Sequence, residues 1–205
     1  MKKTLLAILF ACCTMGLAAQ EGIRVYYQGA KPTISDFVWA FLDNAVDEGE
    51  DAEYVDESAR ALKMAWINKR NGVPLDQGET LTIDQKNGFA VYETKYEGEM
   101  LRIEMCYWNE ADQKHKLFAF SISSFVNGKY EPGQNDGLTF FRYNNTTKTM
   151  NAFFDVGFDI DMATSDGGWI SYALPRAGKD ITVTYWKNGR KSFKTLKWNG
   201  RKFSF

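Results

Sequence analysis

Residues 179–205 read KDITVTYWKNGRKSFKTLKWNGRKFSF, and this stretch decides the architecture of the C-terminal half. The dipeptide Asn-Gly occurs at residues 188–189 and again at residues 199–200. Both central residues of a type I′ turn need positive φ, which glycine adopts freely and asparagine tolerates. The stretch therefore predicts three antiparallel strands joined by two-residue turns.

These turns set a register in which Ile181 lies opposite Leu196 and Leu196 lies opposite Phe203. The three apolar side chains then share one face. The other face collects small polar residues (Thr182, Thr195 and Ser204). One apolar and one polar face predict an antiparallel sheet that packs on a single side.

The chain begins MKKTLLAILFACCTMGLAAQ, with two lysines, a short apolar run and small residues near position 19. This pattern predicts a secretory signal peptide over residues 1–19, since the run is too short to span a membrane. We expect an exported protein, periplasmic or extracellular, with no transmembrane segment. The tetrapeptide ending at Cys12 resembles a bacterial lipobox, but Phe10 fits that motif poorly, so we do not expect a lipid anchor at Cys12.

Charge is nearly balanced overall but is unevenly distributed along the chain. Loss of Lys2 and Lys3 with the signal peptide leaves 23 basic and 26 acidic residues, so nothing predicts a nucleic-acid partner. Residues 32–59 contain nine acids and no lysine or arginine, whereas eight bases from residue 179 onward oppose only Asp180. Two interpretations are open: solvated faces of one domain, or a basic surface for an anionic glycan or membrane face. We favour the first, because lysines also protect edge strands from aggregation.

Helical periodicity is confined to residues 33–72. Apolar residues recur at the spacing of one helical face (Ile34, Phe37, Val38, Phe41, Leu42 and Ala45). Thr33 and Ser35 are the two candidate caps for this helix. A second helix is expected from about residue 56 to residue 70, with Asn71-Gly72 as its stop.

From residue 79 onward the period becomes two, and turn signals recur every 8 to 12 residues, as in a meander. Asn87-Gly88 predicts a two-residue turn, and a turn at Gly98 places Glu93 opposite Arg102. The predicted fold is α+β: two N-terminal helices, then a curved antiparallel β-meander of about nine or ten strands, barrel-like or a sandwich. We expect one β-rich domain over residues 20–205, with its helical part at 33–72 and its meander at 79–205.

No catalytic motif is present, and we predict no catalytic residue. His115 is the single histidine, and its Lys-His-Lys context predicts an exposed turn residue. Cys106 is the one cysteine beyond the signal peptide, and we expect it to be a packed, inert thiol. These features favour a protein without catalytic activity over an enzyme.

Asp159, Asp161 and Asp166 are the candidate metal ligands, because closely spaced carboxylates on a loop can converge on Ca²⁺. Their spacing does not match an EF-hand loop, and acidic loop residues are usually just solvated. No other cofactor is predicted.

Aromatic residues are abundant: six tryptophans, ten tyrosines and fifteen phenylalanines. Trp108, Trp186 and Trp198 lie beside predicted turns, where a ring can be half exposed and can bind a ligand. Trp198 is expected to face Arg201 across the last turn as a cation–π pair. The competing interpretation is that these rings plug the ends of the fold.

The sequence predicts a non-catalytic binding protein of a bacterial envelope, with a protein or glycan partner and an oligomeric state left open. One alternative is a carboxylate-dependent glycan hydrolase that uses Asp155, Asp159 or Asp161. The other is a lipocalin-like carrier, which requires an empty apolar cavity inside the sheet.

Overall fold

A computed structural model describes residues 22–45 and 57–205 of the 205-residue chain. The predicted signal peptide, Cys12 and residues 46–56 of the acidic stretch lie outside the described residues. The helices are α1 (Ile34–Ala45) and α2 (Glu57–Asn71). The strands are β1 (Ile23–Arg24), β2 (Glu79–Asp84), β3 (Phe89–Tyr96), β4 (Glu99–Asn109), β5 (His115–Val126), β6 (Lys129–Tyr130), β7 (Gly137–Asn144), β8 (Thr149–Ala152), β9 (Trp169–Ala173), β10 (Ile181–Lys187), β11 (Arg190–Trp198) and β12 (Phe203–Ser204).

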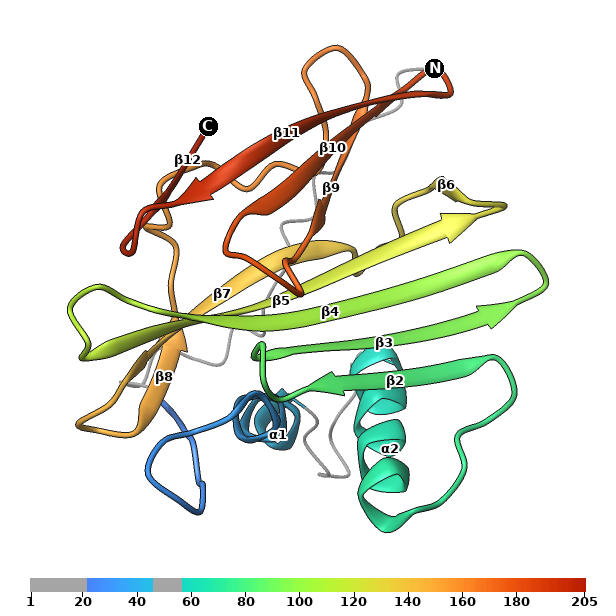
Figure 1. Cartoon of the computed structure of the whole chain (residues 1–205). Helices are drawn as coiled ribbons and strands as arrows, with labels where there is room; N and C mark the ends of the chain where they lie inside the picture. Colours follow the sequence, from blue (N-terminus) through green and yellow to red (C-terminus); the bar gives the residue numbers. More distant parts are fainter. Residues whose placement is uncertain (1–21, 46–56) are drawn as a thin grey trace.

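The described elements form three layers, with the helices on one face of a large sheet and a smaller sheet on the other (Figure 1). The large sheet has eight strands in the order β1-β8-β7-β5-β4-β3-β2, with β6 paired to β5, and it curls into a half-barrel. The small sheet has four strands in the order β12-β11-β10-β9. The predicted fold class is confirmed: two N-terminal helices precede antiparallel sheets. The described strands number twelve, more than predicted, because β1, β6 and β12 have only two residues each.

Helix α1 begins where the sequence predicts a cap. The Asp36 carboxylate accepts hydrogen bonds from the backbone N–H and the hydroxyl of Thr33, both at 2.7 Å, which fixes the first turn. Helix α2 ends at Asn71, and the φ of +69° at the next residue, Gly72, takes the chain out of the helix, as predicted. Neither helix, nor any other described segment, is long and apolar enough to cross a membrane as a helix.

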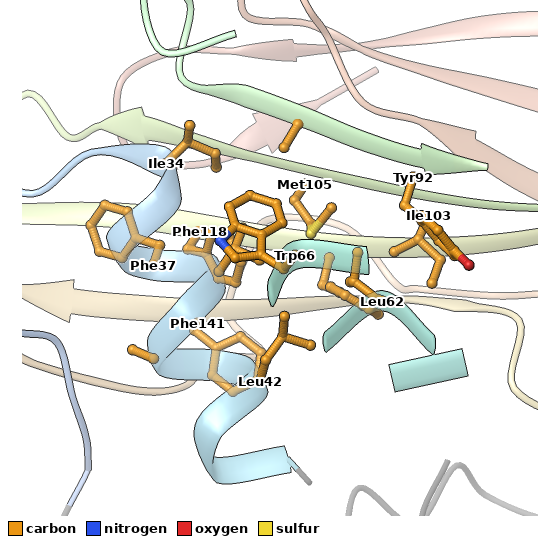
Figure 2. Close-up of a cluster of buried hydrophobic side chains, with 14 of the residues drawn as sticks. Ile34, Phe37, Leu42, Leu62, Trp66, Tyr92, Ile103, Met105, Phe118 and Phe141 are labelled. Atoms are coloured by element: carbon orange, nitrogen blue, oxygen red, sulfur yellow. The ribbon is translucent and has the colours of Figure 1, made fainter. Parts of the chain in front are cut away.

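Side chains of the helices fill the concave side of the large sheet (Figure 2). The ring of Phe37 lies 5.8 Å from Phe118 and 5.1 Å from Tyr143, measured between centroids, and Phe41 lies 4.6 Å from Phe120. The space that a lipocalin-like carrier would need for its ligand is therefore occupied by the protein's own rings.

The large sheet is buried on both faces where its central strands run. Along β4, Ile103 and Met105 face the helices, whereas Cys106 and Trp108 face the small sheet. Strand β5 accordingly has an unbroken buried run over residues 116–123. Packing on a single side, predicted from the last hairpin, therefore does not extend to the centre of the large sheet, because a second layer covers it.

Two of the predicted turns have the predicted register. Ile181 pairs with Leu196 across the β10–β11 turn, and Glu93 pairs with Arg102, whose Nη1 lies 2.8 Å from the carboxylate. Ile181, Leu196 and Phe203 are also buried together in the core between the two sheets, although Phe203 does not lie opposite Leu196.

Two other registers are shifted by two residues from the prediction. Trp198, not Leu196, pairs with Phe203. Leu81 pairs with Tyr92, not with Thr94, which is the partner that a two-residue turn at Asn87-Gly88 predicts. In each turn a side-chain oxygen accepts backbone N–H groups and holds a four-residue loop in place of a two-residue one. Asn199 Oδ1 accepts from residues 201 and 202 at 2.9 Å each, and Asp84 Oδ1 accepts from residue 87 at 3.2 Å.

Candidate functional site

The candidate site is the free end of the β10–β11 hairpin, which we call the hairpin tip and define as residues 185–195. Asn188 and Gly189 form its turn with φ values of +50° and +74°, as a type I′ turn requires. In Figure 1 the tip extends from the small sheet on the side away from the helices. All residues from 190 to 195 are exposed, on both faces of β11. The tip is thus a two-sided surface that adds little to either core.

Each face of the hairpin tip carries one lysine held over two aromatic rings. On one face, Lys191 Nζ lies 5.8 Å from the ring centroid of Trp186 and 5.6 Å from that of Phe193. On the other, Lys194 Nζ lies 5.3 Å from the centroids of both Tyr185 and Phe205. The ring faces attract the ammonium groups and favour these positions on the surface.

Most of the positive charge at the tip has no acidic partner among the described residues. Lys187 is the exception, since it pairs with Asp166. Arg190, Lys191 and Lys194 form no ion pair within the described parts of the chain. An open hollow of about 880 Å³ follows the tip, lined by residues of β10, β11 and their turn together with Thr164 and Asp166. The tip can therefore attract an anion and offers rings against which it can pack.

The four predicted ligand-binding residues do not form one surface. Trp108 and Trp198 are buried in the core between the two sheets, with their ring centroids 6.0 Å apart. Trp108 Nε1 donates to the Lys179 carbonyl at 2.8 Å. The predicted cation–π pair of Trp198 with Arg201 is wrong, because the shifted register places Phe203 against Trp198, with 4.8 Å between the ring centroids. For these two tryptophans the competing interpretation, rings that plug the fold, describes what is observed.

Trp186 is the one predicted residue that belongs to the hairpin tip. It is partly exposed, and its Nε1 donates to Ser171 Oγ at 2.8 Å. Its ring centroid lies 5.9 Å from Tyr130 of β6 and 6.3 Å from Phe125 of β5. Trp186 thus connects the base of the tip to the large sheet.

The three predicted calcium ligands do not converge. Among the described residues, the one group of three potential ligand side chains within 4.8 Å of one another is Glu110, Asp112 and His115. Asp166 instead accepts from Lys187 and Thr164, and the hydrogen bond from Lys187 lowers its pKa. The convergence that a Ca²⁺ site at residues 159–166 requires is therefore absent from the described part of the chain.

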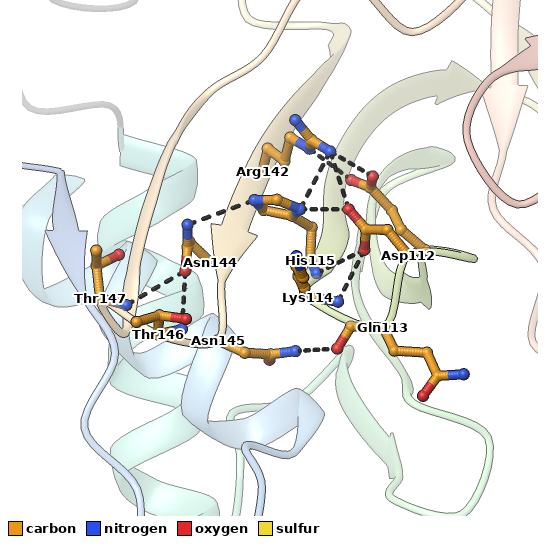
Figure 3. A network of polar contacts seen from close by, with 10 residues as sticks. Asp112, Gln113, Lys114, His115, Arg142, Asn144, Asn145, Thr146 and Thr147 are labelled. Carbon is orange, nitrogen blue, oxygen red and sulfur yellow. Dashed lines mark hydrogen bonds and ion pairs between the residues drawn. The ribbon is translucent and has the colours of Figure 1, made fainter.

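The polar network around His115 was not predicted from the sequence (Figure 3). His115 was expected to be an exposed turn residue, but it begins β5 with only 22% of its side chain exposed. Its Nδ1 lies 2.6 Å from Asp112 Oδ2, and this hydrogen bond is the main reason that the pKa of Asp112 is lowered to about 2. The signal that could have found the network is the Asp-x-x-His spacing beside the turn at residues 110–114.

Arg142 makes this network a structural ion cluster. Its Nε and Nη2 donate to the two carboxylate oxygens of buried Glu110 at 2.7 and 2.6 Å, and this bidentate bond raises the pKa of Arg142. The guanidinium already satisfies the oxygens that a cation would need, and its charge repels one. We therefore interpret the cluster as a tie between β7 and the turn that precedes β5.

The two described acids with raised pKa values each accept a hydrogen bond from a backbone N–H. Burial raises the pKa of Glu104 and of Asp136. Glu104 accepts a hydrogen bond from the Leu174 backbone N–H at 2.7 Å, and Asp136 accepts from the Ser124 backbone N–H and hydroxyl at 2.7 and 2.6 Å. Asp155, named for the hydrolase alternative, is ion-paired with Lys202 at 2.6 Å. The contacts of these three acids give that alternative no support.

Cys106 lies opposite Phe89 on the face of β4 that packs against the small sheet. It is 3% exposed, and burial raises the pKa of its thiol well above the ordinary value. The thiolate that a nucleophile requires is therefore disfavoured at this position.

Comparison of the chain with protein-family models, with curated proteins and with solved structures found no match in any of the three.

Proposed function

We propose that this is an exported, non-catalytic binding protein that recognises a negatively charged partner through the hairpin tip. Export rests on the predicted signal peptide, and the absence of catalysis rests on the lack of a nucleophile and base constellation in the sequence. The choice of the tip as the binding surface rests on its cations and exposed rings.

The observation that carries the proposal is the pairing of cations with exposed rings on both faces of the tip. Phe193 is 59% exposed and Phe205 is 65% exposed, although neither ring contributes to a core. Lysines alone would protect an edge strand from aggregation, but that role does not call for large exposed rings beside them. A binding surface uses both, since the rings supply apolar contact and the cations supply attraction for an anion.

The proposal also favours the second interpretation of the uneven charge. Because Arg190, Lys191 and Lys194 are exposed and form no ion pair with a described acid, their field extends into solvent and accelerates encounter with an anion. Screening by salt then weakens the interaction.

A pair of double charge reversals tests the surface. The Lys191→Glu/Lys194→Glu variant should bind polyglutamate and dextran sulfate at least about tenfold more weakly than the unchanged protein at low salt. Lys86→Glu/Lys114→Glu makes the same change in net charge at exposed residues of the β2–β3 and β4–β5 turns, away from the tip, and it should bind nearly as well as the unchanged protein. Fluorescence anisotropy of labelled polyanions measures the affinities, and circular dichroism checks that each variant is folded.

Equal weakening by both double variants would mean that only net charge matters, and this would overturn the assignment to the tip. An unchanged protein that binds neither polyanion would overturn the proposed function itself.

A further inference from the structure

We infer that the partner is an acidic, extended peptide segment that adds as a further strand to the free edge of β11. This inference rests on the proposed function and specifies the chemistry of its ligand.

The outer edge of β11 is open along most of its length. Strand β12 pairs only with Lys197 and Trp198, and no described strand lies beside residues 190–196 on the side away from β10. Unpaired N–H and C=O groups on such an edge are a template for another strand.

The register identifies which backbone groups face outward. The two-residue turn closes with a hydrogen-bonded pair of Lys187 and Arg190, because the residues that flank a tight turn exchange its hydrogen bond. Hydrogen-bonded pairs alternate along an antiparallel ladder. The N–H and C=O groups of Lys191, Phe193 and Thr195 therefore point away from β10, toward the open edge.

The side chains along this edge define the sequence that fits it. An antiparallel strand would have one residue opposite each of residues 195 to 190. Acidic residues would complement Lys194, Lys191 and Arg190, and an aromatic residue would lie beside exposed Phe193. The complementary hexapeptide is Thr-Glu-Phe-Thr-Glu-Glu, written from the position opposite Thr195 to the position opposite Arg190.

Charge disfavours a second copy of this chain as the occupant. Strand β11 contains two lysines and an arginine within residues 190–194 and no acid anywhere. Two such edges side by side would therefore bring like charges together. This repulsion leaves an acidic segment as the occupant that the edge selects.

Backbone methylation of the hexapeptide tests strand addition without altering the protein. N-methylation of the phenylalanine removes an N–H that would bond to Phe193, and the affinity should fall at least about tenfold. N-methylation of the second threonine, opposite Ser192, blocks an N–H that points to solvent, so the affinity should change less than about twofold. Isothermal titration calorimetry of the full-length protein measures both peptides against the unmethylated one.

Hydrogen exchange provides a second readout. Added peptide should slow amide exchange at Lys191, Phe193 and Thr195, whereas Ser192 and Lys194 already bond to β10 and should change little. A peptide with lysine in place of each glutamate should not bind.

The outcomes separate the two proposals. Suppose that polyanions bind at the tip. If the two N-methyl groups then have equal effects, or if amide exchange is not slowed, strand addition is overturned and the proposed function remains intact. Loss of hexapeptide and polyanion binding alike would overturn both proposals. Concentration-dependent dimerisation abolished by Lys191→Glu/Lys194→Glu would identify a second copy as the occupant and overturn the inference.

Discussion

An asparagine in a hairpin turn can act through its backbone or through its side chain, and this protein contains both cases. Asn188 adopts positive φ and forms a two-residue turn, so its register could be predicted from the sequence. Asn199 instead accepts two backbone N–H groups with its side chain, which lengthens the loop and shifts the register by two. The dipeptide is the same, so local sequence alone does not separate the two outcomes. Each residue still faces the predicted side of the sheet, because a shift of two residues preserves the alternation of side chains.

Glu104 offers a residue-scale test of the contact between the two sheets. Its carboxylate lies between Arg102, 2.7 Å from Nη2, and the Leu174 backbone N–H. Burial raises its pKa above the ordinary value of a glutamate despite the opposing effect of Arg102. A group with a raised pKa in the folded state stabilises the fold below its unfolded pKa, and that contribution is lost as pH rises through the folded value.

Glu104→Gln mimics the protonated acid, so we expect this variant to be more stable than the unchanged protein at pH 8 and the difference to shrink toward pH 5. Glu104→Ala leaves the Leu174 N–H without its acceptor and should lose about 1–3 kcal/mol at either pH. Urea unfolding at both pH values measures these changes. A glutamine variant that is less stable at pH 8 than at pH 5, relative to the unchanged protein, would contradict the assignment.

At the scale of elements, the β10–β11 hairpin shows how far the sequence alone leads. Alternation and the Asn-Gly turn predict its strands, its register and its buried row. They do not predict which part of the hairpin leaves the core, because that depends on how far the large sheet beneath it extends. For the same reason the sequence does not decide whether Trp108 and Trp198 lie at the surface or inside the fold, because residues near a turn are exposed only if no second layer covers them. Here that layer exists, and both rings lie inside it.

Substitution of Gly189 tests the role of the β10–β11 turn. Gly189→Ala places a Cβ at a φ of +74°, which costs about 1–2 kcal/mol, although nothing within 4 Å would clash. Because the tip adds little to either core, we expect faster amide exchange in residues 185–195 and a smaller change in global unfolding. Gly137→Ala is the control, since that glycine has no positive φ and its Cβ would also meet open space. Equal effects of the two substitutions would contradict the role of the turn.

At the scale of the whole molecule, two cores share one sheet. Neighbouring residues of β5 belong to opposite cores, with Phe118 facing the helices and Ala119 facing the small sheet. The sequence predicts two helices and a meander, but it does not predict that the last strands separate and cover the convex side of the first ones. That arrangement depends on contacts between residues far apart in the chain.

A shared central sheet should make unfolding cooperative. Phe118→Ala removes a ring from the helix-side core and Phe140→Ala removes one from the other core, and each should cost about 3–5 kcal/mol. We expect each variant to unfold in one transition, followed equally by circular dichroism and tryptophan fluorescence. Two separated transitions, with Phe140→Ala moving only one of them, would instead indicate that the sheets unfold independently.

Because residues 190–195 are exposed on both faces, their side chains can be replaced without opening a void in either core. The positions that determine what the protein recognises are therefore nearly independent of the positions that keep it folded. Evolution can retune the tip toward a new ligand while the scaffold stays unchanged, and a laboratory library that randomises the same six positions should yield folded proteins in most of its members.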